Sequence, residues 1–121
     1  MTVAYWVVAG LLALFYLYSG GIKIVRSADQ LRPMMAWIDT VPLRLVRTIG
    51  VLEVLGAAGL ILPPVTGIAP GLAVAAAAGL IAIQVGATTL HLRRREISVI
   101  GLNLALLALA GVATWLATIW I

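Results

Sequence analysis

Residues 47–63 read RTIGVLEVLGAAGLILP, an apolar run that begins at an arginine, holds one acid at Glu53 and ends at a proline. An α-helix rises 1.5 Å per residue, so about 20 apolar residues cross a hydrocarbon core about 30 Å thick. Because an isolated strand cannot satisfy its backbone in lipid, apolar stretches of this length are predicted to be helices. The chain has four of them, over residues 2–22, 41–62, 71–90 and 97–121. The sequence therefore predicts an all-α membrane protein, a bundle of four transmembrane helices in one domain, residues 1–121.

The composition of the 121-residue chain favours the same environment. It is 64% hydrophobic and 10% charged, whereas soluble domains average about 45–50% and about 25%. Apolar spans separate the basic clusters, so the net charge of +4 indicates membrane topology rather than nucleic-acid binding. The absence of cysteine excludes disulfides, thiol catalysis and Cys-ligated metals. A single histidine cannot form a multi-histidine centre within one chain, and no metal site is predicted.

The positions of the basic residues predict the orientation. Five of the eight lie between the first span and Thr48, where the second span becomes truly apolar, three lie between the third and fourth spans, and the connection 63–70 carries none. The positive-inside rule then puts both basic loops in the cytoplasm and both termini outside. We expect aromatic anchors at the outer interface: Tyr5, Trp6, Trp115 and Trp120.

The connections between the spans carry recognisable signals. Pro63 and Pro64 are predicted to end the second helix, and Pro70 to begin the third. Ser27 and Gln30 have capping-box spacing, which predicts a short helix between the first two spans. Its apolar residues predict a segment lying on the inner membrane surface: Leu31, Met34, Met35, Trp37 and Ile38. The run 93–95, three arginines, is expected to meet anionic headgroups.

Each span carries one polar residue at a similar predicted depth. These residues lie six or seven positions inside the cytoplasmic boundary, or about 9–10 Å at helical rise. They are Tyr16, Glu53, Gln84 and Asn103. Helical spacing adds Ser19 and Lys23 to the Tyr16 face, and Thr88 and His91 to the Gln84 face.

Glu53 is the strongest candidate for function in this layer. A carboxyl group facing lipid costs at least about 2.5–3.5 kcal/mol, so Glu53 should face the bundle. Gly50 and Gly56 on the same face permit close approach of another helix. Lys23 is the expected partner, with His91 and Arg47 as alternatives. The pocket predicted to open toward the cytoplasm is formed by Tyr16, Ser19, Lys23, Arg47, Glu53, Gln84, Thr88, His91 and Asn103.

A structural role is the alternative for most of these residues. Hydroxyl and amide side chains commonly join helices in membrane bundles, and Lys23 and Arg47 can extend to the interface from helix ends. The third span also has two series of small residues at four-residue spacing, which favour tight packing within the chain, against a copy or against a partner. They are Gly71, Ala75 and Gly79, and Ala78, Ala82 and Gly86.

Three segments together resemble the DoxX-like family: YSGGIK at 18–23, the run 47–63 quoted above, and GATTLH at 86–91. The resemblance implies a small four-helix protein of the bacterial inner membrane. Its relatives include a subunit associated with terminal quinol oxidation and thiosulfate:quinone oxidoreductase. Others are linked to oxidative-stress complexes, or to membrane assembly and trafficking. The family pattern falls on Lys23, Arg47, Gly50, Glu53, Gly56 and His91.

Three functions remain open from the sequence. The leading hypothesis is an accessory membrane subunit, without catalytic activity of its own, that binds a quinone or lipid beside Glu53. The second is a purely structural or assembly subunit of a homo-oligomer or larger complex in the lipid bilayer. The third is a small membrane enzyme with Glu53 as acid and base. Haem ligation by His91 is disfavoured by three adjacent arginines and the lack of a second ligand.

Overall fold

Four long helices make up the structure, a computed structural model that describes all 121 residues and contains no strand. Each of the four, the last counted with its flanking 3₁₀ turns, is long and apolar enough to cross a membrane. The predicted four-helix membrane bundle is therefore confirmed. The helices are α1 (Thr2–Val25), α3 (Leu43–Thr66), α4 (Leu72–Arg93) and α5 (Ile100–Ala117), with the 3₁₀ turns η2 (Ile97–Val99) and η3 (Thr118–Trp120) flanking α5.

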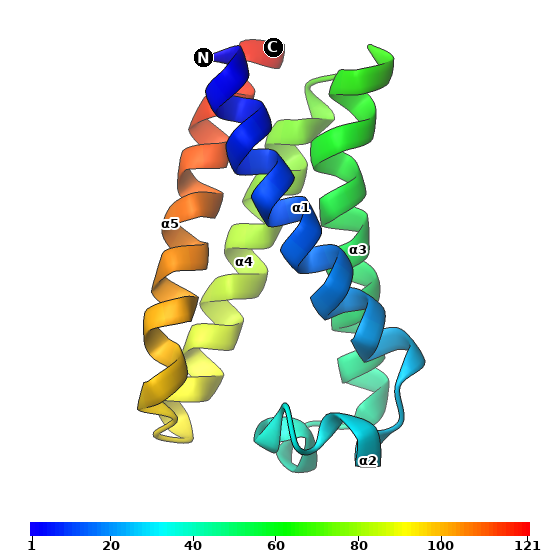
Figure 1. Cartoon of the computed structure of the whole chain (residues 1–121), viewed down its shortest axis with the longest axis vertical. Helices are drawn as coiled ribbons and strands as arrows, with labels where there is room; N and C mark the ends of the chain where they lie inside the picture. The colour runs from blue at the N-terminus through cyan, green and yellow to red at the C-terminus, as the bar shows by residue number, and fades with distance from the viewer.

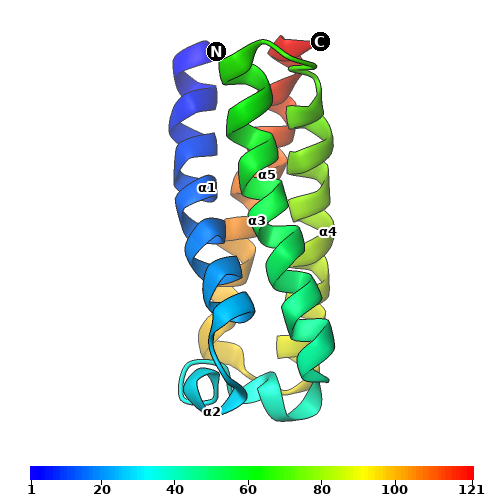
Figure 2. The same cartoon turned by 90° about the vertical axis from the view of Figure 1, so that its right-hand side faces the viewer.

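The helices run up and down, so both termini lie at one end of the bundle (Figure 2). The opposite end, called here the basic end, carries the α1–α3 and α4–α5 connections with the basic residues. Helix α1 packs mainly against α3, and α4 against α5. Figure 1 shows these two pairs close together near the termini and diverging toward the basic end.

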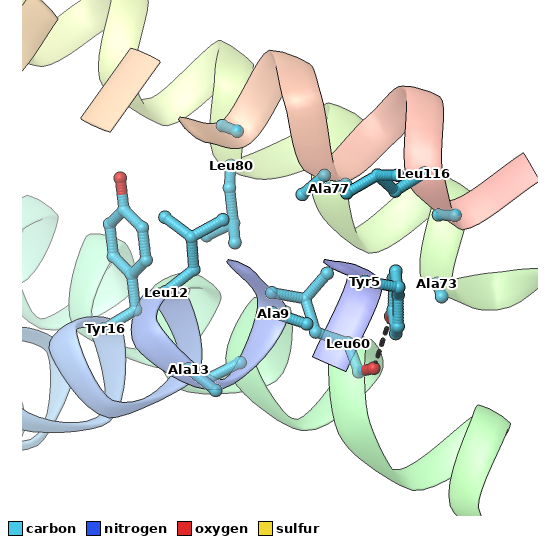
Figure 3. Packing of buried hydrophobic residues seen from close by; sticks show 14 of the residues in the cluster. Tyr5, Ala9, Leu12, Ala13, Tyr16, Leu60, Ala73, Ala77, Leu80 and Leu116 are labelled. Atoms are coloured by element: carbon cyan, nitrogen blue, oxygen red, sulfur yellow. Dashed lines mark hydrogen bonds between the residues drawn. The ribbon is translucent and has the colours of Figure 1, made fainter. Parts of the chain in front are cut away.

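The half of the bundle near the termini is a tightly packed apolar core. Buried leucines from α1, α3 and α4 meet there, and alanines at the contacts let the backbones approach (Figure 3). Tyr5, expected at the membrane interface, is instead fully buried in this core, with its ring edge-on to Trp6 and Trp120. Its hydroxyl donates to the Leu60 carbonyl oxygen at 2.5 Å. The aromatic ring thus joins α1, α3 and η3.

The prediction that Pro63 and Pro64 end the second helix is wrong. Helix α3 continues through both prolines and ends at Gly67, whose φ of 72° is left-handed and whose N–H donates to the Pro63 carbonyl. Proline has no N–H, so Pro64 cannot donate to Leu60 four residues earlier. The Tyr5 hydroxyl donates to that carbonyl instead. A side chain from α1 therefore replaces a hydrogen bond that the proline removes from α3.

Residues 26–42, called here the cap segment, join α1 to α3 and contain α2 (Ala28–Leu31) and η1 (Ala36–Thr40). The predicted capping box at Ser27 and Gln30 is confirmed. The apolar residues of the segment were expected on the membrane surface, and this is wrong for three of them. They are buried against the bundle because α1 and α3 offer an apolar surface beside them: Leu31, Trp37 and Ile38, which pack with Ile22 and Val46.

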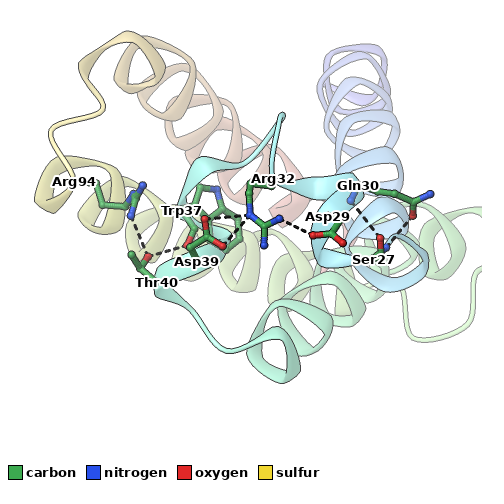
Figure 4. Close-up of polar contacts among 8 residues, drawn as sticks. All are labelled: Ser27, Asp29, Gln30, Arg32, Trp37, Asp39, Thr40 and Arg94. Carbon is green, nitrogen blue, oxygen red and sulfur yellow. Dashed lines mark hydrogen bonds and ion pairs between the residues drawn. The ribbon is translucent and has the colours of Figure 1, made fainter.

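Polar contacts hold the cap segment in place (Figure 4). Arg32 joins its two halves, donating to Asp29 at 2.6 Å and to Asp39 at 3.0 Å. Arg94, from the α4–α5 connection, donates to Thr40 at 3.3 Å. The cap segment therefore reaches across the basic end and contacts both helix pairs.

Replacing Tyr5 with phenylalanine tests how α3 passes through its prolines. Tyr5→Phe leaves the buried Leu60 carbonyl without a donor, and the expected loss of stability is about 1–3 kcal/mol. Tyr18→Phe is the matched control, because Tyr18 is exposed and its hydroxyl makes no hydrogen bond. The midpoint of unfolding in a denaturing-detergent titration measures both. Equal midpoints for the two variants would contradict this role of Tyr5.

Candidate functional site

The centre of the site is a buried ion pair between α1 and α3. Lys23 Nζ lies 2.5 Å from Glu53 Oε1 and also donates to Ser19 Oγ at 2.8 Å. Glu53 is 2% exposed and Lys23 is 8% exposed, so both charged groups lie inside the bundle, away from lipid and water. Lys23 is thus the partner of Glu53, as expected from the sequence. Charges buried in this way are stable only when they face each other.

Two glycines allow the ion pair to form. A Cβ atom at Gly20 would lie 2.6 Å from the Gly50 carbonyl oxygen, and one at Gly50 would lie 2.8 Å from the Gly20 carbonyl oxygen. Neither distance is compatible with a side chain, so the two backbones touch at this level. This close approach brings Lys23 of α1 and Glu53 of α3 within hydrogen-bonding distance.

A second set of hydrogen bonds links the two helix pairs. Tyr16 of α1 donates to Gln84 Oε1 at 2.8 Å, and Gln84 Nε2 donates to Asn103 Oδ1 at 2.9 Å. The chain of side chains runs from α1 through α4 to α5, and all three residues are buried. Three of the four residues in the predicted polar layer are therefore joined by hydrogen bonds, and the fourth, Glu53, forms the separate ion pair with Lys23.

Two buried polar atoms of this layer have no partner. They are Glu53 Oε2, an acceptor, and Asn103 Nδ2, a donor. Most buried polar groups in native proteins are hydrogen-bonded, and one left without a partner costs about 1–3 kcal/mol. Both residues line the same cavity. An acceptor and a donor without partners therefore belong to two residues of the cavity wall.

The cavity lies between the diverging helix pairs at the basic end and has a volume of about 530 Å³. Fifteen of its 22 lining residues are hydrophobic, so polar groups occupy only a small part of its wall. The cap segment contributes Met34, Met35, Trp37 and Val41. This volume is within the range of ligand sites, about 300–1,000 Å³. The cap segment, which the sequence did not place in the pocket, thus forms part of the cavity wall at the basic end.

Seven of the nine predicted site residues line this cavity: Tyr16, Ser19, Lys23, Glu53, Gln84, His91 and Asn103. The other two do not, because their polar groups bind the backbone elsewhere. Thr88 donates to the Gln84 carbonyl of its own helix at 2.8 Å. Arg47 donates to the carbonyls of Lys23 and Arg26 at 2.7 and 2.5 Å, where the end of α1 leaves them without helical partners.

His91 stands at the edge of the cavity and contacts charged groups outside it. Its Nδ1 lies 3.0 Å from Glu96 Oε1, which also accepts from Arg94 at 3.0 Å. Burial acts to raise the pKa of the Glu96 carboxyl, but the hydrogen bonds from His91 and Arg94 outweigh it and lower that pKa below its usual range. Because Arg94 also binds Thr40, a continuous set of contacts joins His91 to the cap segment.

Sequence reasoning missed the cap segment as part of the wall. The apolar residues around Trp37 are consistent with a segment that packs on the bundle, but the same pattern equally suits a segment that lies on a lipid surface. Phe15 and Ile49, which also line the cavity, cannot be distinguished by sequence from the other apolar residues of their spans.

Comparison with known proteins places the chain in a family. The model of the DoxX-like family matches residues 7–113, which is most of the chain. The chain belongs to the DoxX-like family. No match was found among curated proteins or among solved structures. It is thus a DoxX-like multi-pass membrane protein, and the features that resembled the family have physical roles here. Lys23 and Glu53 form the ion pair, Gly50 permits it, and Arg47 holds the end of α1 beside it.

A charge-removal series tests the ion pair. Lys23→Met leaves the Glu53 carboxyl buried without a cation, and the expected loss of stability is about 3–5 kcal/mol. The double variant Lys23→Met/Glu53→Gln removes both charges and should recover most of that loss. Arg44→Met is the control, because Arg44 is exposed at the basic end. Thermal unfolding in mild detergent measures all three, and a double variant no more stable than Lys23→Met would contradict the pairing.

Proposed function

We propose that this DoxX-like protein is an accessory subunit that binds a small hydrophobic molecule, a quinone or a lipid, in the cavity beside Glu53. The single observation that carries the proposal is that two residues lining one apolar cavity each have a buried polar atom without a partner, Glu53 Oε2 and Asn103 Nδ2. A ligand that satisfies both recovers the free energy that their burial costs. An accessory subunit needs only this binding, without chemistry of its own.

The residues present suit a quinone or its reduced form. Asn103 Nδ2 can donate to a ring oxygen of either form, and Glu53 Oε2 can accept from a ring hydroxyl of the reduced form. The apolar wall suits the ring and the attached chain. A lipid with ester and hydroxyl groups has the same donors and acceptors, so the two ligands share one recognition chemistry.

The proposed setting is the bacterial cytoplasmic membrane, with the basic end inside and both termini outside. All eight basic residues lie in or beside the two connections at that end, and the connection between α3 and α4 has no charge. The positive-inside rule favours this orientation. The ligand then binds within the inner half of the bilayer, about one turn or two from the cytoplasmic surface.

A structural subunit is the second candidate, and one observation favours it. Helix α4 carries a face of small residues that are exposed on the single chain: Ala75, Ala78, Gly79, Ala82 and Gly86. Such faces allow close packing of a second helix in a membrane. A copy of the chain or a larger protein could therefore cover α4. Under this hypothesis, Gly79→Leu disrupts co-purification of that partner.

Native mass spectrometry of the protein purified gently from its own membrane tests ligand binding. Glu53→Gln keeps an oxygen for Lys23 but replaces the free acceptor with an NH₂ donor. We expect the amount of retained small molecule to fall at least about tenfold, a change of about 1.4 kcal/mol in binding free energy.

Thr88→Val is the matched control, because Thr88 lies in the same layer of α4 but binds only its own helix. Thr88→Val should retain the molecule as the wild type does. Both variants should have unfolding temperatures well above the purification temperature, so that both remain folded throughout. Equal retention by the wild type and Glu53→Gln would refute the proposal. A larger protein bound in place of a small molecule would favour the structural subunit.

A further inference from the structure

The wall of the cavity continues onto the outer surface of the bundle between α3 and α4. Ala82 and Gly86 both line the cavity and are exposed. Each lies two positions from Gln84, or about 200° around the helix, so they are on the far side of α4 from the buried amide. Across the gap, Leu45 of α3 lines the cavity and is 49% exposed. The cavity therefore reaches the lipid-facing surface at this level.

The route from the basic end is more restricted. The cap segment lies across that end, with Trp37 buried and in the cavity wall. It is held at both sides, by Arg94 bound to Thr40 and by Arg47 bound to the Arg26 carbonyl at the start of the segment. A molecule that arrives from the basic end meets the cap segment and the polar groups that hold it. One that arrives through the bilayer meets only apolar or small side chains between α3 and α4.

The polar layer selects against a charged head. Lys23 and Glu53 neutralise each other, and no other cation of the chain bonds to Glu53. An anionic head beside Glu53 would lack a counter-charge, and a cationic head would compete with Lys23 for a carboxylate that is already paired. The free acceptor and the free donor instead match an uncharged group with a hydroxyl and a carbonyl or ether oxygen.

We infer that the cavity takes an uncharged, oxygen-headed amphiphile that enters from the bilayer between α3 and α4 and leaves its apolar chain in that opening beside Gly86. The inference rests on the proposed function and specifies its ligand class and access route. The head reaches Glu53 and Asn103, and the chain remains in contact with lipid. No part of the ligand crosses the cap segment.

Substitutions at two glycines of α4 test the route. A Cβ atom at either Gly86 or Gly79 meets nothing within 4 Å, so leucine fits at both positions without a clash. Of these two glycines, Gly86 lines the cavity and Gly79 does not. Gly86→Leu should fill the opening, whereas Gly79→Leu adds the same side chain two turns away on a similar face. Any effect common to both variants reports partner contacts or general packing.

The probe is a monoacylglycerol with a diazirine in its acyl chain, added to the full chain in lipid nanodiscs and crosslinked by light. We expect labelling that unmodified monoacylglycerol competes away, on peptides that contain Leu45–Ile49 and Ala82–Gly86. Gly86→Leu should reduce this labelling at least about tenfold, and Gly79→Leu less than about twofold. A fatty acid and a lysophosphatidic acid with the same chain should compete poorly.

Each opposite result overturns the inference. Wild-type labelling in Gly86→Leu, or labels only on Phe15 and Leu102 at the α1–α5 side, would reject the route. Equal competition by the two anionic lipids would reject the uncharged head. If Glu53→Gln loses its retained molecule while Gly86→Leu labels normally, the proposed function stands and only the route fails. If neither variant changes binding of any molecule, both fail.

Discussion

The ion pair between Lys23 and Glu53 is the constraint on which the rest of the structure depends. A carboxylate in the membrane must be paired, and the pairing requires α1 and α3 to touch at Gly20 and Gly50. Arg47 then fixes the end of α1 about two turns below Glu53 along α3. These contacts make α1 and α3 one unit at the basic end, so α4 and α5 can diverge from it and leave a cavity.

The two halves of the bundle differ in how their helices are joined. Near the termini, buried alanines and leucines pack against one another, and the Tyr5 hydroxyl donates to the Leu60 carbonyl that lacks its helical partner in α3. At the basic end, amide and hydroxyl side chains span a wider gap through single hydrogen bonds. Two polar atoms there remain unpartnered at a cost of about 1–3 kcal/mol each. A ligand that pairs with both atoms would offset this cost, which is why we propose a binding site in this layer.

The sequence was sufficient for those features that one physical requirement determines without help from distant residues. Span length and the cost of a lone charge in lipid predict the four helices and the pairing of Glu53. It failed where a distant residue changes the local outcome. Helix α3 continues past Pro64 because the Tyr5 hydroxyl donates to the Leu60 carbonyl, which lies 55 residues away from Tyr5 in sequence. The apolar pattern of the cap segment does not specify lipid or protein as its surface, and Arg47 at a helix end resembles any interfacial arginine.

The central claim is that Glu53 and Asn103 face a bound molecule inside the bundle. Solid-state NMR of the isotopically labelled protein in its own membrane tests it most directly, through contacts from Asn103 Nδ2 and the Glu53 carboxyl carbon. The account predicts cross-peaks from both sites to protons that belong neither to the protein nor to water. Contacts from both sites to water alone would contradict it and would make the polar layer a hydrated joint between helices.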